Sequence, residues 1–183
     1  MGQIWLTSDM HFCHDRDFIF KPRGFETVEE MNEAIVRNWN LVVKDGDDVY
    51  VLGDCMLKDN ETGIQLMKSL KGRLHIILGN HDTDARRKLY ATIENVVEIL
   101  YATVLKYRGY HFYLSHYPTL CGNYDDSESL KTRLISLCGH AHTPDRFADW
   151  EQGVIYHCEL DAHDCRPVSI DEVVEDCEKK WAE

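Results

Sequence analysis

The chain has 183 residues, of which 44% are hydrophobic and 28% charged, a composition typical of a folded globular protein rather than of a disordered or fibrous one. Its net charge of −12 argues against binding to long nucleic acids, because that binding needs a face rich in Lys and Arg. No apolar run approaches the roughly 20 residues that span a bilayer, and the N-terminus lacks the pattern of a signal peptide. We therefore expect one cytoplasmic domain over residues 1–183, with no membrane partner.

The first half of the chain alternates short β-like runs with amphipathic helices. Strands are predicted at residues 3–7, 49–52 and 74–78. Residues 27–30 have the form of a capping box and open a helix with a helical spacing of apolar residues at Val28, Met31, Ile35, Trp39 and Val42. A second helix is predicted at about residues 61–70 and is ended by Lys71-Gly72.

The second half contains patterns of antiparallel strands. Residues 96–107 and 110–114 are predicted to pair through a turn at Arg108-Gly109, and further strands are predicted at 134–137 and near 154–160. A capping box at 169–172 opens a terminal helix. Helices between the early strands and hairpins later favour an α/β fold in which a pair of mixed sheets is flanked by helices.

Seven cysteines are scattered along the chain without a CxxC pair, which disfavours a zinc knuckle. Since no secretion signal is present, a disulfide framework is not expected either. We expect reduced, mostly buried thiols that behave as small apolar residues. They are Cys13, Cys55, Cys121, Cys138, Cys158, Cys165 and Cys177.

Five predicted strands end in residue types that bind metals. These residues are Asp9, His11, Asp54, Asn80, His81, His116, His140 and His142. A lone Asp or His at a strand end is more often a turn residue, but His does not favour turns, so five such ends together indicate a metal site. Ligands gather beyond the carboxyl ends of strands in folds of this kind.

Not every motif in this set is specific alone. Asp9-Met10-His11 is a D-x-H motif, which in an extended segment directs both side chains to the same side. A second D-x-H at Asp161-Ala162-His163 shows that the motif also occurs by chance, and we exclude it from the predicted site.

The ligand types indicate the kind of ion. Imidazoles and carboxylates with one amide and no thiolate suit Mn²⁺, Fe, Zn²⁺ or Ni²⁺. Seven ligands exceed the need of one tetrahedral ion, and a shared carboxylate would let them hold two ions about 3.5–4 Å apart. Such a pair neutralises phosphate oxygens and lowers the pKa of a bridging water, while a nearby His can protonate the leaving alkoxide.

The ordered set of D-x-H, G-D, G-N-H-D, a lone His and G-H-x-H resembles the calcineurin-like metallophosphoesterases, and the short chain is similar to their small bacterial or phage members. The resemblance implies a two-sheet β-sandwich flanked by helices and a hydrolase of phosphodiesters or phosphomonoesters that uses two divalent ions, manganese favoured. It implies a first ion on Asp9, His11 and His142. It implies a second ion on Asn80, His116 and His140. Asp54 would bridge the ions, and His81 would be the general acid, with Asn80 also close to the phosphate.

The sequence departs from this family pattern after Asp54. Many relatives have G-D-x-x-D, in which the second Asp orients the catalytic His, whereas Leu57 stands at that position here. Asp82 and Asp59 are the candidates to orient His81 instead.

Three further residues are candidates for contact with the substrate. His14 could reach the phosphate or a ligand of the metal, or could be a surface histidine. Arg23 could clamp a phosphate, with a solvated loop arginine as the alternative. Tyr117 could form a wall of the site or serve packing. Four other histidines are assigned to structure or surface: His75, His111, His157 and His163.

Two other functions compete with hydrolysis of a small-molecule phosphate ester. A nuclease is possible for short oligonucleotides or cyclic nucleotides, but the acidic charge disfavours long ones. A non-catalytic interaction scaffold would be expected to have lost ligands or the acid, whereas all these positions are filled here. Substrate specificity would lie in the loops at 12–27 and 117–130, and the oligomeric state stays open.

Overall fold

Two β-sheets form the centre of the computed structural model, which describes residues 2–120, 129–148 and 153–183. The first sheet has the order β4-β3-β2-β1-β9. Its strands are β1 (Ile4–Thr7), β2 (Asp48–Val51), β3 (Arg73–Ile77), β4 (Val96–Leu100) and β9 (Val168–Ser169). The strands β1 to β4 run parallel, and the short β9 is antiparallel to β1. Consequently the carboxyl ends of β1, β2 and β3 lie at one edge of this sheet.

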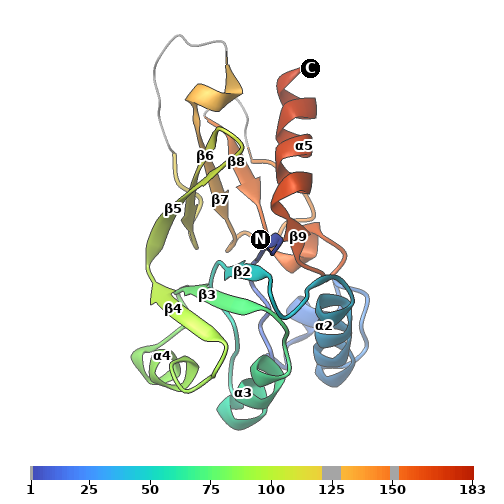
Figure 1. Ribbon diagram of the computed structural model, residues 1–183. Helices are drawn as coiled ribbons and strands as arrows, with labels where there is room; N and C mark the ends of the chain where they lie inside the picture. The colour runs from blue at the N-terminus through green and yellow to red at the C-terminus, as the bar shows by residue number, and fades with distance from the viewer. Residues whose placement is uncertain (1, 121–128, 149–152) are drawn as a thin grey trace.

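The second sheet has the order β5-β6-β7-β8 and lies above the first in Figure 1. Its strands are β5 (Ala102–Tyr107), β6 (Tyr110–Ser115), β7 (Leu134–Cys138) and β8 (Ile155–His157). The pair β5–β6 is antiparallel, whereas β6, β7 and β8 are parallel. Arg108 and Gly109 join β5 to β6 with φ of 49° and 86°. Positive φ at both positions is what a two-residue type I′ hairpin turn requires, which confirms the predicted turn.

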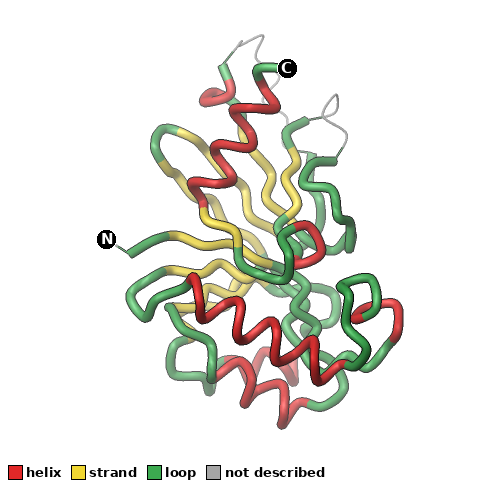
Figure 2. Tube along the Cα trace, turned by 90° about the vertical axis from the view of Figure 1, so that its right-hand side faces the viewer, coloured by secondary structure: helices red, strands yellow, loops and turns green. Residues whose placement is uncertain are grey.

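Helices flank both sheets, as Figures 1 and 2 show. They are α1 (Asp17–Phe20), α2 (Val28–Val42), α3 (Asn60–Lys68), α4 (Asp84–Tyr90), α5 (Ile170–Trp181) and the 3₁₀ turns η1 (Leu130–Thr132) and η3 (Leu160–Ala162). The helices α2, α3 and α4 are the crossovers that parallel strands need between β1, β2, β3 and β4. The predicted α/β architecture, two sheets with helices outside, is confirmed. In the part of the chain that the structure describes, no helix has the length and apolar character needed to cross a membrane.

The two predicted capping boxes differ: the one at α5 is complete, and the one at α2 is only half formed. Ser169 and Glu172 form the complete capping box of α5. At α2 only half of the predicted box exists: the Glu30 N–H donates to Thr27 Oγ1, but the Glu30 carboxylate accepts from the backbone of Glu26 instead of Thr27. Thr27 therefore still caps the N–H of Glu30 in the first turn of α2. The Glu30 carboxylate pairs with the N–H of Glu26, which lies before the helix.

Two apolar clusters fix the positions of the layers. The first lies between the first sheet and its crossover helices and contains Met31, Trp39 and Val51. The second joins the two sheets to α5 and contains Leu52 and Val173. Val51 and Leu52 are neighbours in the chain, so the two-residue period of a strand sends them into different clusters. The first sheet is thus covered by an apolar cluster on each face, and the loops at the carboxyl ends of its strands lie between these two clusters.

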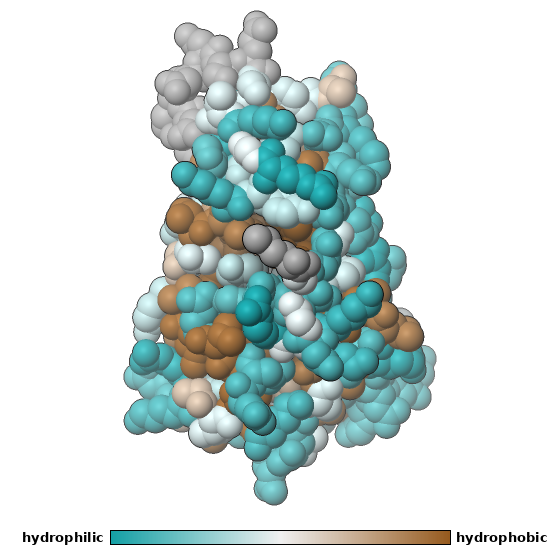
Figure 3. All heavy atoms as spheres, in the orientation of Figure 1, coloured by the Kyte–Doolittle hydropathy of each residue, from teal (hydrophilic) through white to brown (hydrophobic). Residues whose placement is uncertain are grey.

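The predicted strand at 96–107 is wrong in one respect, because it is two strands in different sheets. β4 pairs with β3, and β5 pairs with β6, with Tyr101 between them. Both are edge strands, with Val97 and Val104 exposed on them. Figure 3 shows apolar surface on the left side of the molecule, where β4 and β5 lie. The run has no Gly or Pro to mark the change of sheet, which tertiary pairing alone determines.

The cysteines in the described residues agree with the expectation. Six of them are free and buried: Cys13, Cys55, Cys138, Cys158, Cys165 and Cys177. Cys121 and part of the predicted specificity loop at 117–130 lie outside the described residues.

Candidate active site

The predicted ligands follow the carboxyl ends of β1, β2, β3, β6 and β7, and hydrogen bonds of backbone and side chains connect these five loops. The N–H groups of Asp9 and His11 donate to the carbonyl oxygens of Gly53 and Asp54, both over 3.0 Å. The N–H of Gly139 donates to the carbonyl of His116, also over 3.0 Å. The loops after both sheets therefore converge on one site.

A first group of ligand atoms comes from Asp9, His11 and His142. Asp9 Oδ1 lies 3.6 Å from His11 Nε2 and 3.5 Å from His142 Nε2. The two Nε2 atoms are 3.1 Å apart. Asp9 is completely buried, and among the described residues its Oδ1 has no hydrogen-bond partner. A buried carboxylate oxygen without a donor is costly, and a cation between these three side chains would remove that cost.

A second group consists of Asp9, Asp54 and His116. His116 Nε2 lies 3.5 Å from Asp54 Oδ2 and 2.9 Å from Asn80 Oδ1. His116 Nδ1 lies 2.8 Å from the carbonyl oxygen of Leu52, which can only accept, so the proton belongs on Nδ1. With the proton on Nδ1, Nε2 presents a lone pair beside Asn80 Oδ1, and an imidazole nitrogen with an amide and a carboxylate oxygen is a donor set that fits a divalent transition-metal ion.

Both three-residue groups contain Asp9, and the ligand atoms within each group lie within 4.8 Å of one another. Asp54 Oδ2 also lies between the groups, 3.6 Å from His11 Nε2 and 3.5 Å from His116 Nε2. Asp54 was the shared ligand expected from the family resemblance. The geometry offers two carboxylates for sharing, Asp9 as well as Asp54.

The backbone at the ligands is left-handed rather than extended. The φ angles of five of them are between 48° and 73°: Asp9, His11, Asp54, His140 and His142. The expectation of an extended D-x-H motif is therefore wrong, although both side chains still reach the site. Non-glycine residues rarely adopt this conformation, and Asp and His tolerate it better than most. Such angles gather at functional sites, where the surroundings hold them.

Two glycines lie so close to ligand carboxylates that no side chain would fit. A Cβ on Gly79 would be 2.2 Å from Asp54 Oδ1, and one on Gly139 would be 2.2 Å from Asp9 Oδ2. The glycines of the predicted G-N-H-D and G-H-x-H motifs are thus needed for close approach of the loops.

Asp82, one of the two candidates to orient His81, makes its hydrogen bonds to other residues. Its Oδ2 accepts the N–H groups of Asp54 and Gly79, and its Oδ1 accepts the N–H of Cys55 and the hydroxyl of Tyr90. Asp82 therefore ties the loop after β2 to the loop after β3. Asp59 is the N-cap of α3, where it accepts from Thr62, and it does not contact His81 either.

His81 lies at the mouth of the site with 43% of its side chain exposed. Its N–H donates to Asp54 Oδ1 over 2.8 Å, and its Nε2 lies 4.0 Å from Asp54 Oδ2. In the described ranges, no other carboxylate lies within ion-pair distance of this ring. Asp54 thus takes the place of the missing aspartate as the carboxylate nearest to His81.

His140 and Tyr117 form the opposite side of the site. The Tyr117 ring lies 4.7 Å from the His140 ring and 5.2 Å from the His116 ring, measured between centroids. The His140 N–H donates to Asp9 Oδ2 over 2.8 Å, but its ring is not part of either three-residue group. Tyr117 is half exposed, and its ring lies beside those of two predicted ligands.

His14 is not a surface residue. It is buried, and its Nδ1 lies 3.1 Å from Nδ1 of His11. Burial, together with repulsion from His11, lowers the pKa of His14 to about 4. Of the expected alternatives, the surface position is wrong, and His14 contacts a predicted metal ligand.

Arg23 is neither a solvated loop residue nor free to clamp a phosphate. Its Nε and one terminal nitrogen donate to both carboxylate oxygens of Asp161, over 3.1 and 2.7 Å. It also donates to the carbonyl oxygens of Asp9 and Met10. Its donors are occupied by protein acceptors, so the expected substrate contact does not fit this structure.

The charge states of the ligands suit a metal. Burial by itself would raise the pKa of Asp9, but the neighbouring imidazoles of His11 and His142 outweigh it and lower the pKa to about 2. Burial lowers the pKa of His11. These shifts favour the ionised carboxylate of Asp9 and the neutral imidazole of His11, which are the forms that bind metals. At His142 burial lowers the pKa, but the hydrogen bond with Asp161 and the charge of Asp9 outweigh it and raise the pKa.

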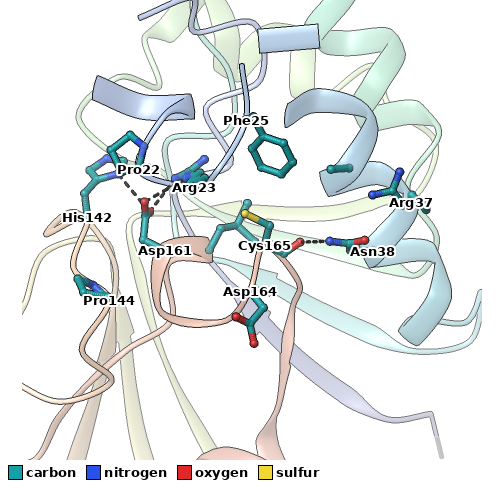
Figure 4. A pocket seen from close by; sticks show the side chains of 12 residues that line it. Pro22, Arg23, Phe25, Arg37, Asn38, His142, Pro144, Asp161, Asp164 and Cys165 are labelled. Atoms are coloured by element: carbon teal, nitrogen blue, oxygen red, sulfur yellow. Dashed lines mark hydrogen bonds and ion pairs between the residues drawn. The ribbon is translucent and has the colours of Figure 1, made fainter. Parts of the chain in front are cut away.

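Sequence reasoning missed Asp161. Its Oδ2 lies 3.3 Å from His142 Nδ1, on the side of the ring opposite the first group. Figure 4 shows Asp161 between His142 and Arg23, beside a cavity of about 500 Å³. The second D-x-H motif was the available signal, and it was set aside because one such motif is expected by chance.

The sequence model of the calcineurin-like phosphoesterase superfamily domain matches residues 3–157. The chain belongs to this superfamily. An uncharacterized protein of Methanocaldococcus jannaschii is 35% identical to this phosphoesterase over 144 residues, which are 78% of this chain and 70% of that protein. The gene 66 protein of Mycobacterium phage L5 is 30% identical over 166 residues, 79% of this chain and 79% of that protein.

The fold also has a solved counterpart. The structure of a protein of unknown function from Aquifex aeolicus is similar with a TM-score of 0.71 and 23% identity, covering 96% of this chain and 99% of that one. Membership of the superfamily makes this phosphoesterase a metal-dependent hydrolase of phosphoric esters. The family match contains every residue of the two ligand groups, whereas Asp161 lies beyond its last residue.

Proposed function

We propose that this phosphoesterase hydrolyses a phosphodiester or phosphomonoester of a small molecule with two divalent transition-metal ions. The observation that carries the proposal is the pair of ligand groups that share Asp9, whose buried Oδ1 has no donor within the described residues. One ion would be held by Asp9, His11 and His142. The other would be held by Asp54, Asn80, His116 and His140, with Asp9 and Asp54 as the carboxylates available to both.

The ions, when bound, would neutralise phosphate oxygens and supply an activated water as nucleophile. The nitrogen and oxygen donors suit Mn²⁺, Fe, Zn²⁺ or Ni²⁺, and Mn²⁺ is our first choice for assays. The residues of the chain then orient the ester. Asn80 Oδ1 lies 2.9 Å from His116 Nε2, and His81 Nε2 lies 4.0 Å from Asp54 Oδ2, so both side chains would be close to a phosphate bound at the ions.

His81 is our candidate for the general acid. Its ring is 43% exposed, which lets it reach a leaving oxygen, and Asp54 Oδ2 lies 4.0 Å from its Nε2. The hydrogen bond from its backbone to Asp54 Oδ1 fixes the start of the loop that carries it. Protonation of the leaving group by a positioned side chain is worth about 10²–10⁴-fold in rate.

The test uses Mn²⁺-loaded protein with a nitrophenyl and an alkyl ester, each as monoester and diester, and three variants. Asp54→Ala is expected to abolish turnover of every ester. His81→Ala should cost about 10²–10⁴-fold on the alkyl esters and much less on the nitrophenyl esters, because nitrophenolate leaves without a proton. His111→Ala, in β6 and outside the site, is the matched control and should keep wild-type rates.

The outcomes separate the parts of the proposal. An equal loss on both leaving groups in His81→Ala would remove His81 from the acid role. Binding of two Mn²⁺ ions without turnover of any ester would favour the non-catalytic scaffold. A wild-type chain that binds fewer than two ions would refute the dinuclear site.

A further inference from the structure

Three side chains form a connected series behind the first ligand group. Asp161 Oδ2 lies 3.3 Å from Nδ1 of His142, whose Nε2 lies 3.5 Å from Asp9 Oδ1. Arg23 binds the same carboxylate with two nitrogens, over 3.1 and 2.7 Å. Figure 4 shows both contacts as dashed lines, with Asp161 on η3 and Arg23 on a different segment of the chain.

The series is buried enough to be more than a surface ion pair. The side chains of Arg23 and Asp161 are 1% and 11% exposed. Bidentate pairing with a planar guanidinium also fixes the plane of the carboxylate.

Arg23 connects this carboxylate to a second metal ligand. The nitrogen that contacts Asp161 Oδ2 also donates to the carbonyl oxygen of Asp9 over 2.7 Å. Asp9 is at a left-handed φ of 55°. One guanidinium thus holds the backbone of Asp9 and, through Asp161, the ring of His142.

We infer that Asp161, fixed by Arg23, is a positioning residue that orients His142 and strengthens it as a metal ligand. This inference rests on the proposed dinuclear function. The carboxylate accepts the Nδ1 proton, which leaves the Nε2 lone pair for the ion and makes that nitrogen a stronger donor. Asp161 lies on the η3 turn, beyond the residues that the family model matches.

The inference predicts that Asp161 supports only one of the two proposed ion sites. His116, the corresponding ligand of the other site, has its Nδ1 against a neutral carbonyl, that of Leu52, at 2.8 Å. His142 has its Nδ1 against a carboxylate. Loss of the Asp161 charge should therefore weaken one ion site and spare the other.

The experiment titrates metal-free protein with Co²⁺ and follows its visible absorption, which reports the geometry around each bound ion. Asp161→Asn keeps the size of the side chain and an acceptor oxygen but removes the charge. Loss of such support typically costs 10–100-fold in metal affinity. We expect a loss within that range at one of the two sites, a changed spectrum for that site, and unchanged binding at the other. Asp164→Asn, an exposed residue three positions along, is the matched control and should titrate like wild type.

A second measurement avoids variants. In Zn²⁺-loaded wild type, nitrogen–proton correlation spectra of the imidazoles should show His142 with its proton on Nδ1 and the ion on Nε2. The opposite arrangement would overturn the inference, as would wild-type affinity at both sites in Asp161→Asn or an equal loss at both. Failure of the wild type itself to bind two Co²⁺ ions would instead refute the proposed dinuclear function.

Discussion

Replacing Asp82 with Asn should destabilise the metal-free protein by about 2–4 kcal/mol, although Asp82 is not a ligand. Its carboxylate accepts four hydrogen bonds: from the N–H groups of Asp54, Gly79 and Cys55 over 2.8, 2.9 and 3.2 Å, and from the Tyr90 hydroxyl over 2.6 Å. These bonds join the loops that carry Asp54 and His81, so the residue stabilises the site without touching an ion.

The magnitude follows from the groups that Asn cannot satisfy. Its one oxygen can replace Oδ2 and accept from Asp54 and Gly79, and its amide can donate to the Tyr90 hydroxyl. The Cys55 N–H then faces an NH₂ group and stays unpaired, which costs about 1–3 kcal/mol in a buried position. The remaining bonds lose the charge that makes them roughly twice as strong as neutral ones. Tyr90→Phe removes only one donor and should cost about 1 kcal/mol.

The assay is urea unfolding in a chelator, with Asp84→Asn as the control because Asp84 is an exposed aspartate at the start of α4. The control loses only a favourable charge near the N-terminus of a helix, worth about 0.3–1 kcal/mol. If Asp82→Asn is no less stable than Asp84→Asn, the four hydrogen bonds do not hold the loops and the reasoning fails.

Three further results are expected. Gly139→Ala places a Cβ 2.0 Å from Ser8 Oγ and 2.2 Å from Asp9 Oδ2, so metal analysis should show loss of bound ion, whereas Gly46→Ala, with nothing within 4 Å, should keep it. Burial lowers the pKa of His163 to about 4, so the unfolded chain takes up its proton first as the pH falls from 6.5 to 4. Urea unfolding across that range should show a loss of up to about 3 kcal/mol from this group, and His163→Gln should lack that part of the slope. Removal of metal with a chelator should lower the free energy of unfolding by about 2.7 kcal/mol for each ion that is present at a hundred times its Kd. An unchanged calorimetric Tm would contradict a site that binds metal only when folded.

The sequence predicted the parts of the fold that local pattern controls. The strands β1, β2 and β3 lie within a residue or so of their predicted ranges, because each is a short apolar run bounded by residues that end strands. The break at Tyr101 was missed because the apolar run passes through it, and only pairing with β3 on one side and β6 on the other separates the two strands. Local preference contains no information on which sheet a strand joins.

The candidate site also combines features that local sequence controls with contacts that only the folded chain creates. The predicted ligands are brought together because residue type and strand end are local features, and parallel strands place their ends at one edge. The contacts around them are not local. Arg23 and Asp161 are 138 residues apart, and Asp82 reaches back 28 residues to Asp54. Each of these residues looks ordinary in its own segment, so its role follows only from the folded arrangement.

The left-handed φ angles of the predicted ligands need support from the surrounding protein. Each such residue costs about 1–2 kcal/mol, less for Asp and His than for bulkier types, and persists only where its surroundings fix it. At Asp9 the surroundings are the Gly53 carbonyl, the Arg23 guanidinium and the His140 N–H, all within 3.0 Å of an Asp9 atom. All three contacts come from other parts of the chain, so protein contacts hold the backbone conformation that brings the predicted ligands together. Fixing ligands in their binding geometry in this way reduces the cost of binding an ion.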